Sequence, residues 1–309
     1  MEYISKTLDF HVDEPSVISF GKFDGLHRGH EFLMEKQIEQ SNLHGYKRII
    51  FTFDIPPKSE VLGIESKVII TNDEKEYVFE ESGVDYLIEC PFVPEVMNME
   101  ADVFVRWIVK SLNVKCIVVG DDFHFGHNRA GDHHLLAQMA DEMGYELIVV
   151  DKIKDGDRDI SSTYIREEIA VGRIRKANEL LGYPFFIKGK VVHGRQLGRT
   201  IGIPTVNLTV PQEKLLPPNG VYMTKVLVRD NWYLGVTNIG CKPTISGENP
   251  IGAETYIIDF SQDVYGQEIT VELHEFIRAE MKFDSIDELK SQMSADINRT
   301  IRYYRNVTK

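Results

Sequence analysis

A glycine-spaced turn near the start of the chain has the composition of a phosphate cradle. The segment Gly21–His30 follows the apolar run Ser16–Phe20 and leads into a helical pattern over Glu31–Leu43. Glycines let a phosphate approach the backbone closely, and the free N–H groups at a helix N-terminus attract anions. His27 and His30 share one face of the first helical turn. We expect the turn to bind a nucleotide, with both histidines beside its phosphates.

A second group of candidate phosphate ligands lies in Ile160–Arg166. Ser162 and Thr163 stand where a helix would begin, and Arg166 follows within the first turn. Their hydroxyls and the guanidinium group could bind a triphosphate at the helix N-terminus. Helix capping alone would explain the hydroxyl residues but not the arginine.

The loop Gly120–Gly131 combines flexible glycines with two aromatic residues and an arginine. Phe123, Phe125 and Arg129 suit a planar, anionic ligand, because rings stack on aromatic faces and guanidinium groups pair with anions. The alternative is a polar loop whose phenylalanines pack back on the sheet. Both interpretations stay open at this point.

The second half of the chain carries its own polar constellation. Two basic, glycine-rich turns occur in Gly189–Arg195 and Gly198–Leu208. In an extended segment Thr205 and Asn207 point to the same face, where their neutral oxygens suit Mg²⁺ bound to a nucleotide. A turn cap is the alternative for this pair. Glu254 heads an apolar strand and is either a general base or a solvated strand-end charge.

These residues need a scaffold, and the first half of the chain alternates strand-like and helix-like segments. The apolar runs are Ile18–Phe20, Ile49–Phe53, Tyr86–Ile88, Cys116–Val119 and Leu147–Val150, and the later helical patterns are Asp73–Ser82, Ala101–Ser111 and His133–Met143. This alternation predicts βαβ units and a mostly parallel sheet covered on both faces. Ligands of such sheets bind at the carboxyl ends of the strands.

From Phe185 onward the pattern changes to short alternating strands. They are expected at Phe185–His193, Val221–Arg229, Trp232–Asn238, Ala253–Phe260 and Ile269–Arg278, with a final helix over Ile286–Tyr304. Closely spaced strands with turn residues between them favour a small antiparallel barrel. We therefore predict an α/β domain over residues 1–183 and a β-barrel domain over residues 184–309.

Composition limits the class of protein. The formal net charge is −13, which argues against a nucleic-acid binder because such proteins need a basic footprint. The three cysteines lack a CxxC pair, which makes a disulfide framework or structural zinc site unexpected. There is no signal-peptide pattern and no apolar run long enough to span a bilayer. We expect a soluble cytoplasmic protein that needs no membrane and no obligate protein partner.

Taken together, the motifs resemble the bacterial bifunctional riboflavin kinase/FAD synthetase family over essentially the whole chain. GxFDGxHxGH (Gly21–His30) and ISSTxIR (Ile160–Arg166) are similar to the nucleotidyltransferase motifs of the family, and GDDFHFGxxxxG (Gly120–Gly131) is similar to its flavin-side loop. Four further segments are similar to the riboflavin kinase module of the family: GRxxGIPTxN, GVTNIGxxPT, ETYIIDF and Arg278–Asp284.

The resemblance implies a Rossmann-like N-terminal domain that transfers an adenylyl group from ATP to FMN, releasing pyrophosphate. His27, His30 and Arg166 would stabilise charge on the phosphates, and no covalent enzyme intermediate is expected. ATP contacts are implied for Gly21, Phe23, Asp24, Gly25, Gly29, Ser162 and Thr163, and flavin contacts for Asp122, Phe123, Phe125 and Arg129.

The same resemblance implies that the barrel phosphorylates riboflavin to FMN, with ATP as co-substrate and Mg²⁺ as the metal. Glu254 would be the base, and Thr205 and Asn207 would help to hold the metal. ATP contacts are implied for Gly189, Lys190, His193, Gly194, Arg199, Gly202 and Pro204, and flavin contacts for Arg278 and Phe283.

Three residues depart from the family pattern. Pro56 replaces a customary histidine, Lys22 stands where asparagine is common, and Val206 replaces alanine. Two alternatives therefore remain beside the bifunctional enzyme. One is a riboflavin kinase attached to an impaired adenylyltransferase domain, and the other is a flavin-sensing regulator without turnover.

Overall fold

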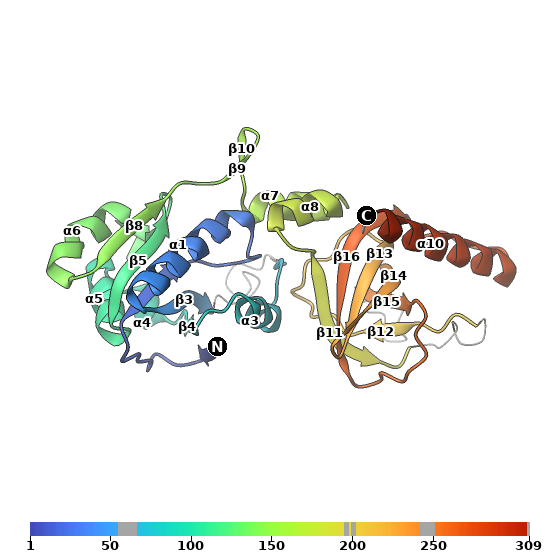
Figure 1. Cartoon of the computed structure of the whole chain (residues 1–309), viewed down its shortest axis with the longest axis horizontal. Coiled ribbons are helices and arrows are strands. Elements are labelled where there is room, and N and C mark those ends of the chain that lie inside the picture. The colour runs from blue at the N-terminus through green and yellow to red at the C-terminus, as the bar shows by residue number, and fades with distance from the viewer. Residues whose placement is uncertain (55–66, 195–197, 199–201, 242–250, 308–309) are drawn as a thin grey trace. The chain divides into compact units, whose positions relative to one another are not determined.

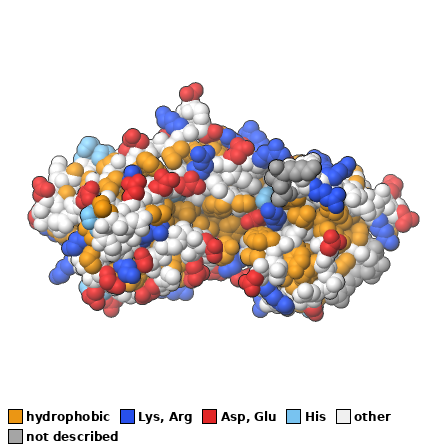
Figure 2. Space-filling model, in the orientation of Figure 1, with side chains coloured by type: hydrophobic (Ala, Val, Ile, Leu, Met, Phe, Trp, Pro, Cys, Tyr) orange, Lys and Arg blue, Asp and Glu red, His pale blue; other side chains and the backbone are white. Residues whose placement is uncertain are grey.

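The computed structural model describes residues 1–54, 67–194, 198, 202–241 and 251–307 (Figure 1). The chain divides into two compact units, Met1–Ser162 and Thr163–Lys309. Charged side chains of both signs are scattered over the face of the molecule shown in Figure 2. Within the described ranges no helix is long and apolar enough to cross a membrane.

The first unit is built on a six-stranded parallel sheet with the order β1-β4-β3-β2-β5-β8. The strands are β1 (Glu2–Ser5), β2 (Ser16–Phe20), β3 (Lys47–Asp54), β4 (Tyr86–Pro91), β5 (Val114–Gly120) and β8 (Glu146–Val150). The central strand β2 is buried along its whole length because both faces of a parallel sheet are covered. The predicted parallel sheet is confirmed.

Helices cover both faces of this sheet (Figure 1). They are α1 (Arg28–His44), α3 (Asn72–Glu81), α4 (Pro94–Met97), α5 (Ala101–Ser111) and α6 (His133–Met143). The main core joins apolar side chains of α5 and α6 to one face of the strands. Local sequence sets the helix ends: Thr71 and Glu74 form a capping box at α3, and Gly45 ends α1 in the left-handed conformation.

Short elements carry the loops at the carboxyl edge of the sheet. They are β6 (His124–Phe125), the 3-10 turn η1 (His127–Arg129), β7 (Gly131–Asp132), β9 (Lys154–Asp155) and β10 (Arg158–Asp159). The pairs β6–β7 and β9–β10 are antiparallel hairpins. The first hairpin begins inside the predicted flavin-side loop and ends one residue beyond it.

The second unit begins with two helices, α7 (Ser162–Ala170, whose first residue closes the first unit) and α8 (Ile174–Leu181). Helix α8 is attached to the barrel, since the Asn178 side chain donates to the carbonyl of Leu273 and accepts from the N–H of Phe185. The predicted domain boundary after residue 183 lies beyond these helices, whereas the compact units divide before Thr163.

The rest of the second unit is a closed antiparallel barrel with the order β11-β12-β15-β14-β13-β16. Its strands are β11 (Phe186–Val192), β12 (Val206–Leu208), β13 (Gly220–Val228), β14 (Asn231–Cys241), β15 (Ile251–Ile257) and β16 (Glu268–Arg278). Closure pairs every strand on both sides, which removes exposed edges. The terminal helix α10 (Ile286–Val307) packs its Tyr304 against Val221, Met223 and Ile277. The predicted barrel and terminal helix are confirmed.

Candidate active sites

The predicted nucleotide-binding turn, Gly21–His30 (the nucleotide turn below), follows β2, and its backbone is strained at Phe23. The N–H of Gly21 donates to the carbonyl of Phe51 on β3, so the turn starts in register with the sheet. Phe23 has a φ of 45° and its side chain is 1% exposed. Its ring packs against Phe79 of α3 and against His30. Burial of this ring holds a conformation that is unfavourable for a residue with a Cβ.

The two histidines of the turn lie against each other. Helix α1 begins at Arg28, three residues before the expected start at Glu31, so His27 is its N-cap and His30 lies in the first turn. Their rings stack with centroids 3.8 Å apart and an interplanar angle of 20°. Each Nδ1 atom is buried and has no hydrogen-bond partner among the described residues. The predicted proximity of the two side chains is therefore present in the fold.

Burial makes both imidazoles hard to protonate. Desolvation lowers the pKa of His27 to about 4. The pKa of His30 is also well below its usual value, first because of burial and then because of repulsion from His27. Both rings are neutral near pH 7 in the free protein. They can offer N–H donors to a phosphate, or take up a proton when an anion binds beside them.

The first residue of α7 contacts the turn directly. The hydroxyl of Ser162 donates to the carbonyl of Asp24 at 2.7 Å. A Cβ at Gly29 would lie 2.9 Å from Nδ1 of His27 and 3.3 Å from the carbonyl of Ile160, so the close approach requires glycine. The structure thus brings the first two predicted motifs together. Thr163 and Arg166 belong to the second unit, and their contacts with a nucleotide stay predictions.

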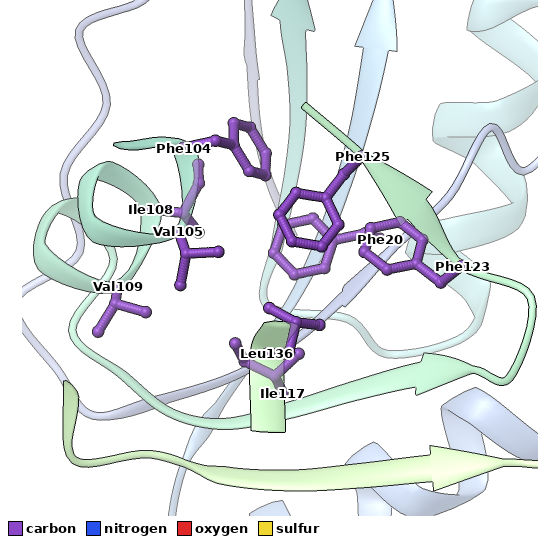
Figure 3. Close-up of a pocket in the computed structure, with 9 residues that line it drawn as sticks. All are labelled: Phe20, Phe104, Val105, Ile108, Val109, Ile117, Phe123, Phe125 and Leu136. Carbon is purple, nitrogen blue, oxygen red and sulfur yellow. The ribbon is translucent and has the colours of Figure 1, made fainter. Parts of the chain in front are cut away.

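The aromatic residues of the flavin-side loop pack on the sheet. Phe125 is 6% exposed and contacts Phe104 of α5, and Phe123 lies nearly parallel to both Phe125 and Phe20 (Figure 3). The small apolar hollow around these rings has a volume of about 10 Å³, enough for one water molecule. An isoalloxazine ring does not fit in it. Phe123 is half-buried, and its contact with a flavin stays a prediction.

Glycines bring this loop close to the start of α5. A Cβ at Gly126 would lie 2.7 Å from Cα of Ala101, and one at Gly131 would lie 2.8 Å from the ring of Phe125. The polar members of the loop are exposed except for His127, which is half-buried. Asp122 forms an ion pair with Lys152 at 2.9 Å, and Arg129 adopts a φ of 59°. Flavin contacts of this loop remain predictions.

The barrel presents a row of polar side chains across three neighbouring strands. Asn207 of β12 lies opposite Glu254 of β15, which lies opposite Asn238 of β14. Residues directly opposite in a sheet share a face and lie close together. The hydroxyl of Thr205 donates to the Glu254 carboxylate, and Glu254 is half-buried. The structure therefore assembles the predicted base and the predicted metal ligands.

The oxygen atoms of three neighbouring side chains at this row fit a magnesium ion. Thr205, Asn207 and Glu254 offer hydroxyl, amide and carboxylate oxygens. A Cβ at Gly194 would lie 2.2 Å from Nδ2 of Asn207, so a glycine is needed for the turn to pass over this amide. The described residues contain no cluster of three His, Cys, Asp or Glu side chains that could hold a metal alone. Mg²⁺ commonly takes few protein ligands and completes its shell with substrate phosphates and water.

The residues predicted to contact ATP in the barrel have differing surroundings in the structure. A Cβ at Gly189 would lie 2.4 Å from the carbonyl of Thr209, which explains the glycine structurally. The ring of His193 stacks on Tyr265 at 3.8 Å. Lys190, Gly202 and Pro204 are exposed. Arg199 and Pro56 lie outside the described residues, whereas Lys22 is described and exposed.

The predicted flavin residue Arg278 is held by the terminal helix. Its Nε and Nη2 atoms lie 3.0 and 2.9 Å from Oδ2 of Asp296, which is 3% exposed. Nη1 donates to the carbonyl of Ala279, and the guanidinium lies 5.8 Å from the ring centroid of Phe283. Arg278 thus connects β16, α10 and Phe283. Its contact with a flavin stays a prediction.

The sequence analysis did not identify Glu280, whose carboxylate contacts Asn238 of the polar row. Glu280 accepts hydrogen bonds from the side-chain amides of Asn238 and Asn219. A Cβ at Gly240 would lie 2.1 Å from Oε1 of Glu280, so glycine makes room for this carboxylate. Its position in the sequence could have identified it, because Asn238 and Gly240 lie in the GVTNIG motif and Glu280 follows Arg278 by two residues.

Comparison with known proteins divides the chain into two parts, as the two compact units do. A family model described as FAD synthetase matches residues 9–164, and one described as riboflavin kinase matches residues 181–304. A solved structure described as a macrolide-efflux protein from Streptococcus pneumoniae superimposes with a TM-score of 0.86 at 32% identity. The match covers 97% of this chain and 98% of that one.

Curated relatives match over nearly their whole length. The bifunctional riboflavin kinase/FMN adenylyltransferase of Listeria monocytogenes is 33% identical, with 96% of this chain and 95% of the relative covered. The protein of the same name from Escherichia coli K12 is 36% identical with the same coverage, and that of Bacillus subtilis is 36% identical over 95% and 94%. The chain belongs to the bifunctional riboflavin kinase/FMN adenylyltransferase family.

Proposed function

We propose that this protein makes FMN from riboflavin and ATP in its barrel unit, and FAD from FMN and a second ATP in its N-terminal unit. The single observation that carries the proposal is the pair of family models, each covering one half of the chain. Both halves also hold the polar groups that the two reactions need. The name of the Streptococcus relative is not carried over, because the curated relatives agree on the two flavin activities.

In the barrel, Glu254 acts as the general base. Its carboxylate accepts the proton of the terminal ribityl hydroxyl while that oxygen forms a bond to the γ-phosphorus of ATP, and ADP leaves. The hydroxyl of Thr205 donates to this carboxylate and fixes its orientation. Thr205 and Asn207 would hold the Mg²⁺ ion. The bound ion would neutralise phosphate charge, so the protein mainly supplies positioning.

In the N-terminal unit, the phosphate of FMN attacks the α-phosphorus of ATP and pyrophosphate leaves. The attacking oxygen is already an anion, so no general base is required. The stacked rings of His27 and His30 donate hydrogen bonds to the phosphates, where negative charge moves from the α-phosphate to the leaving pyrophosphate. Phe123 offers its ring to the flavin, and Arg166 is the proposed partner of the triphosphate.

A product assay tests this function. Purified protein is incubated with riboflavin, ATP and Mg²⁺, and the flavins are separated by chromatography. Accumulation of FAD supports both activities. FMN alone would mean that the adenylyltransferase unit is impaired, which is the reading that Pro56 and Lys22 suggest. Absence of any product would favour a flavin-sensing regulator.

A further inference from the structure

Asp24 of the nucleotide turn accepts hydrogen bonds from the protein through one carboxylate oxygen and through its backbone carbonyl. Its Oδ1 atom accepts from the backbone N–H of Ile69 at 2.7 Å and from that of Ile70 at 3.4 Å. Its backbone carbonyl accepts from the hydroxyl of Ser162. One residue thus joins the turn to two segments that are distant in sequence.

The segments joined by Asp24 bear directly on the predicted site. Ile69 and Ile70 are buried and lead into Thr71, the N-cap of α3. Helix α3 also supplies Phe79, which packs on the ring of Phe23. Ser162 belongs to the second phosphate motif. The carboxylate and the neighbouring aromatic ring therefore tie the same turn to the same helix.

The turn needs such support because both neighbours of Asp24 have positive φ angles and Phe23 is strained by its own. Phe23 has a φ of 45° and Gly25 a φ of 77°. Phe23 in particular occupies a region that L-residues avoid, and such conformations persist only where surrounding contacts enforce them. The side chain of Asp24 supplies the acceptor oxygen for both backbone N–H groups, a role that an uncharged carbonyl oxygen can also fill.

We propose that Asp24 is a positioning residue of the adenylyltransferase site, which acts by locking the strained nucleotide turn to the Ile69–Ile70 backbone. The inference rests on the proposed function of the N-terminal unit. In this proposal Asp24 supports the turn, whereas the family resemblance implied that it contacts ATP directly. The carboxylate fixes the backbone on which His27 and His30 are placed, and those rings contact the phosphates.

The two roles predict different outcomes for a neutral isostere. An asparagine at position 24 keeps an Oδ1 acceptor for the two amides but loses the charge. A residue that held Mg²⁺ or balanced charge at the nucleotide would fail as asparagine as much as it fails as alanine. A positioning residue that works through backbone amides is rescued by asparagine and not by alanine.

The experiment compares Asp24→Asn, Asp24→Ala and the control Asp73→Ala, in which an exposed carboxylate on α3 is removed. FAD formation from FMN and ATP is measured beside FMN formation from riboflavin. Asp24→Ala should lower kcat for FAD formation by about 10–100-fold, because small displacements of catalytic groups have effects of that size. Asp24→Asn should stay within about threefold of the parent, and FMN formation should be unchanged in all variants.

Hydrogen exchange gives a readout that does not depend on activity. The amides of Ile69 and Ile70 should exchange faster in Asp24→Ala and at the parent rate in Asp24→Asn. Equal loss of FAD formation in the two variants would overturn the inference, as would unchanged exchange in Asp24→Ala. If Asp24→Ala does not fold, Asp24→Asn decides alone, since impaired FAD formation with intact FMN formation contradicts positioning. A parent protein that makes no FAD would instead contradict the proposed function, while the exchange experiment still tests the lock.

Discussion

At the scale of single residues, the histidine pair differs from a simple cationic phosphate site. The rings of His27, which is buried, and His30, which is half-buried, stack on each other, and desolvation keeps their pKa values low. A buried, neutral imidazole is a pre-aligned donor that does not repel its neighbour. Near pH 7, protonation then becomes favourable only when an anionic substrate occupies the site.

The low pKa of His27 predicts a pH dependence of stability. Its pKa is about 4 in the folded protein and 6.5 when unperturbed, so the unfolded chain binds more protons between these values. Stability is therefore full above pH 6.5 and is lost as the pH falls towards 4. The contribution lost between pH 7.5 and pH 5 is about 2 kcal/mol.

Urea unfolding at several pH values checks this dependence. His27→Gln should flatten the decrease of unfolding free energy between pH 7.5 and pH 5. His44→Gln, which removes an exposed histidine at the end of the same helix, should leave the decrease as it is. An equal slope in the parent and in His27→Gln would contradict the assignment.

Glu254 gives the sharpest residue-scale prediction for the kinase reaction. Glu254→Gln keeps the hydrogen bond from Thr205 but cannot accept the ribityl proton. FMN formation should fall by about 10²–10⁴-fold, which is the usual contribution of a general base. FAD formation from added FMN should persist. Chromatographic product analysis with each flavin separately measures both, and loss of the two activities together would argue against separate sites.

At the scale of elements, α10 is fastened to the barrel by a buried ion pair. Asp296 accepts from Arg278 and from Gln292, and the Arg278 guanidinium lies over Phe283. The pair therefore connects the end of β16, the following loop and the helix. Removing one member of a buried ion pair leaves the other charge uncompensated.

Asp296→Asn should destabilise the barrel unit by about 3 kcal/mol and raise KM for riboflavin more than KM for ATP. The reason for the KM effect is that Arg278 and Phe283 lose their common support. Denaturant unfolding and steady-state kinetics of FMN formation measure the two effects. Asp287→Asn, in the exposed first turn of α10, is the matched control. A stability equal to the parent would contradict a role for the ion pair in fastening α10.

At the scale of the whole molecule, one chain carries two consecutive reactions, and the product of the barrel is the substrate of the N-terminal unit. His30→Ala should make this order visible. With riboflavin and ATP supplied, FMN should accumulate because FAD formation falls by about 10²–10³-fold while the barrel keeps working. Time courses of the three flavins measure this, and an unchanged FAD yield would remove His30 from the mechanism.

The sequence predicted an element well where the whole segment is buried in the same way along its length. The central strands read as continuous apolar runs because helices cover both faces of a parallel sheet. Strand β1 was missed, since at the edge of the sheet its residues stay exposed or half-buried and lack that pattern. The short strand β12 was missed as well, because its three residues give no periodicity and only pairing with β11 and β15 defines it.

The sequence by itself determined the order of the motifs, the two fold classes and the family, because glycine spacing and hydrophobic period are local properties. Only the tertiary structure decided what individual side chains do. It buried Phe125 in the core, stacked His27 on His30, and gave the Asp24 carboxylate to the amides of Ile69 and Ile70. These partners lie far apart along the chain or on turns of unpredictable geometry. Contact, burial and hydrogen bonding depend on how such segments meet, which no local pattern specifies.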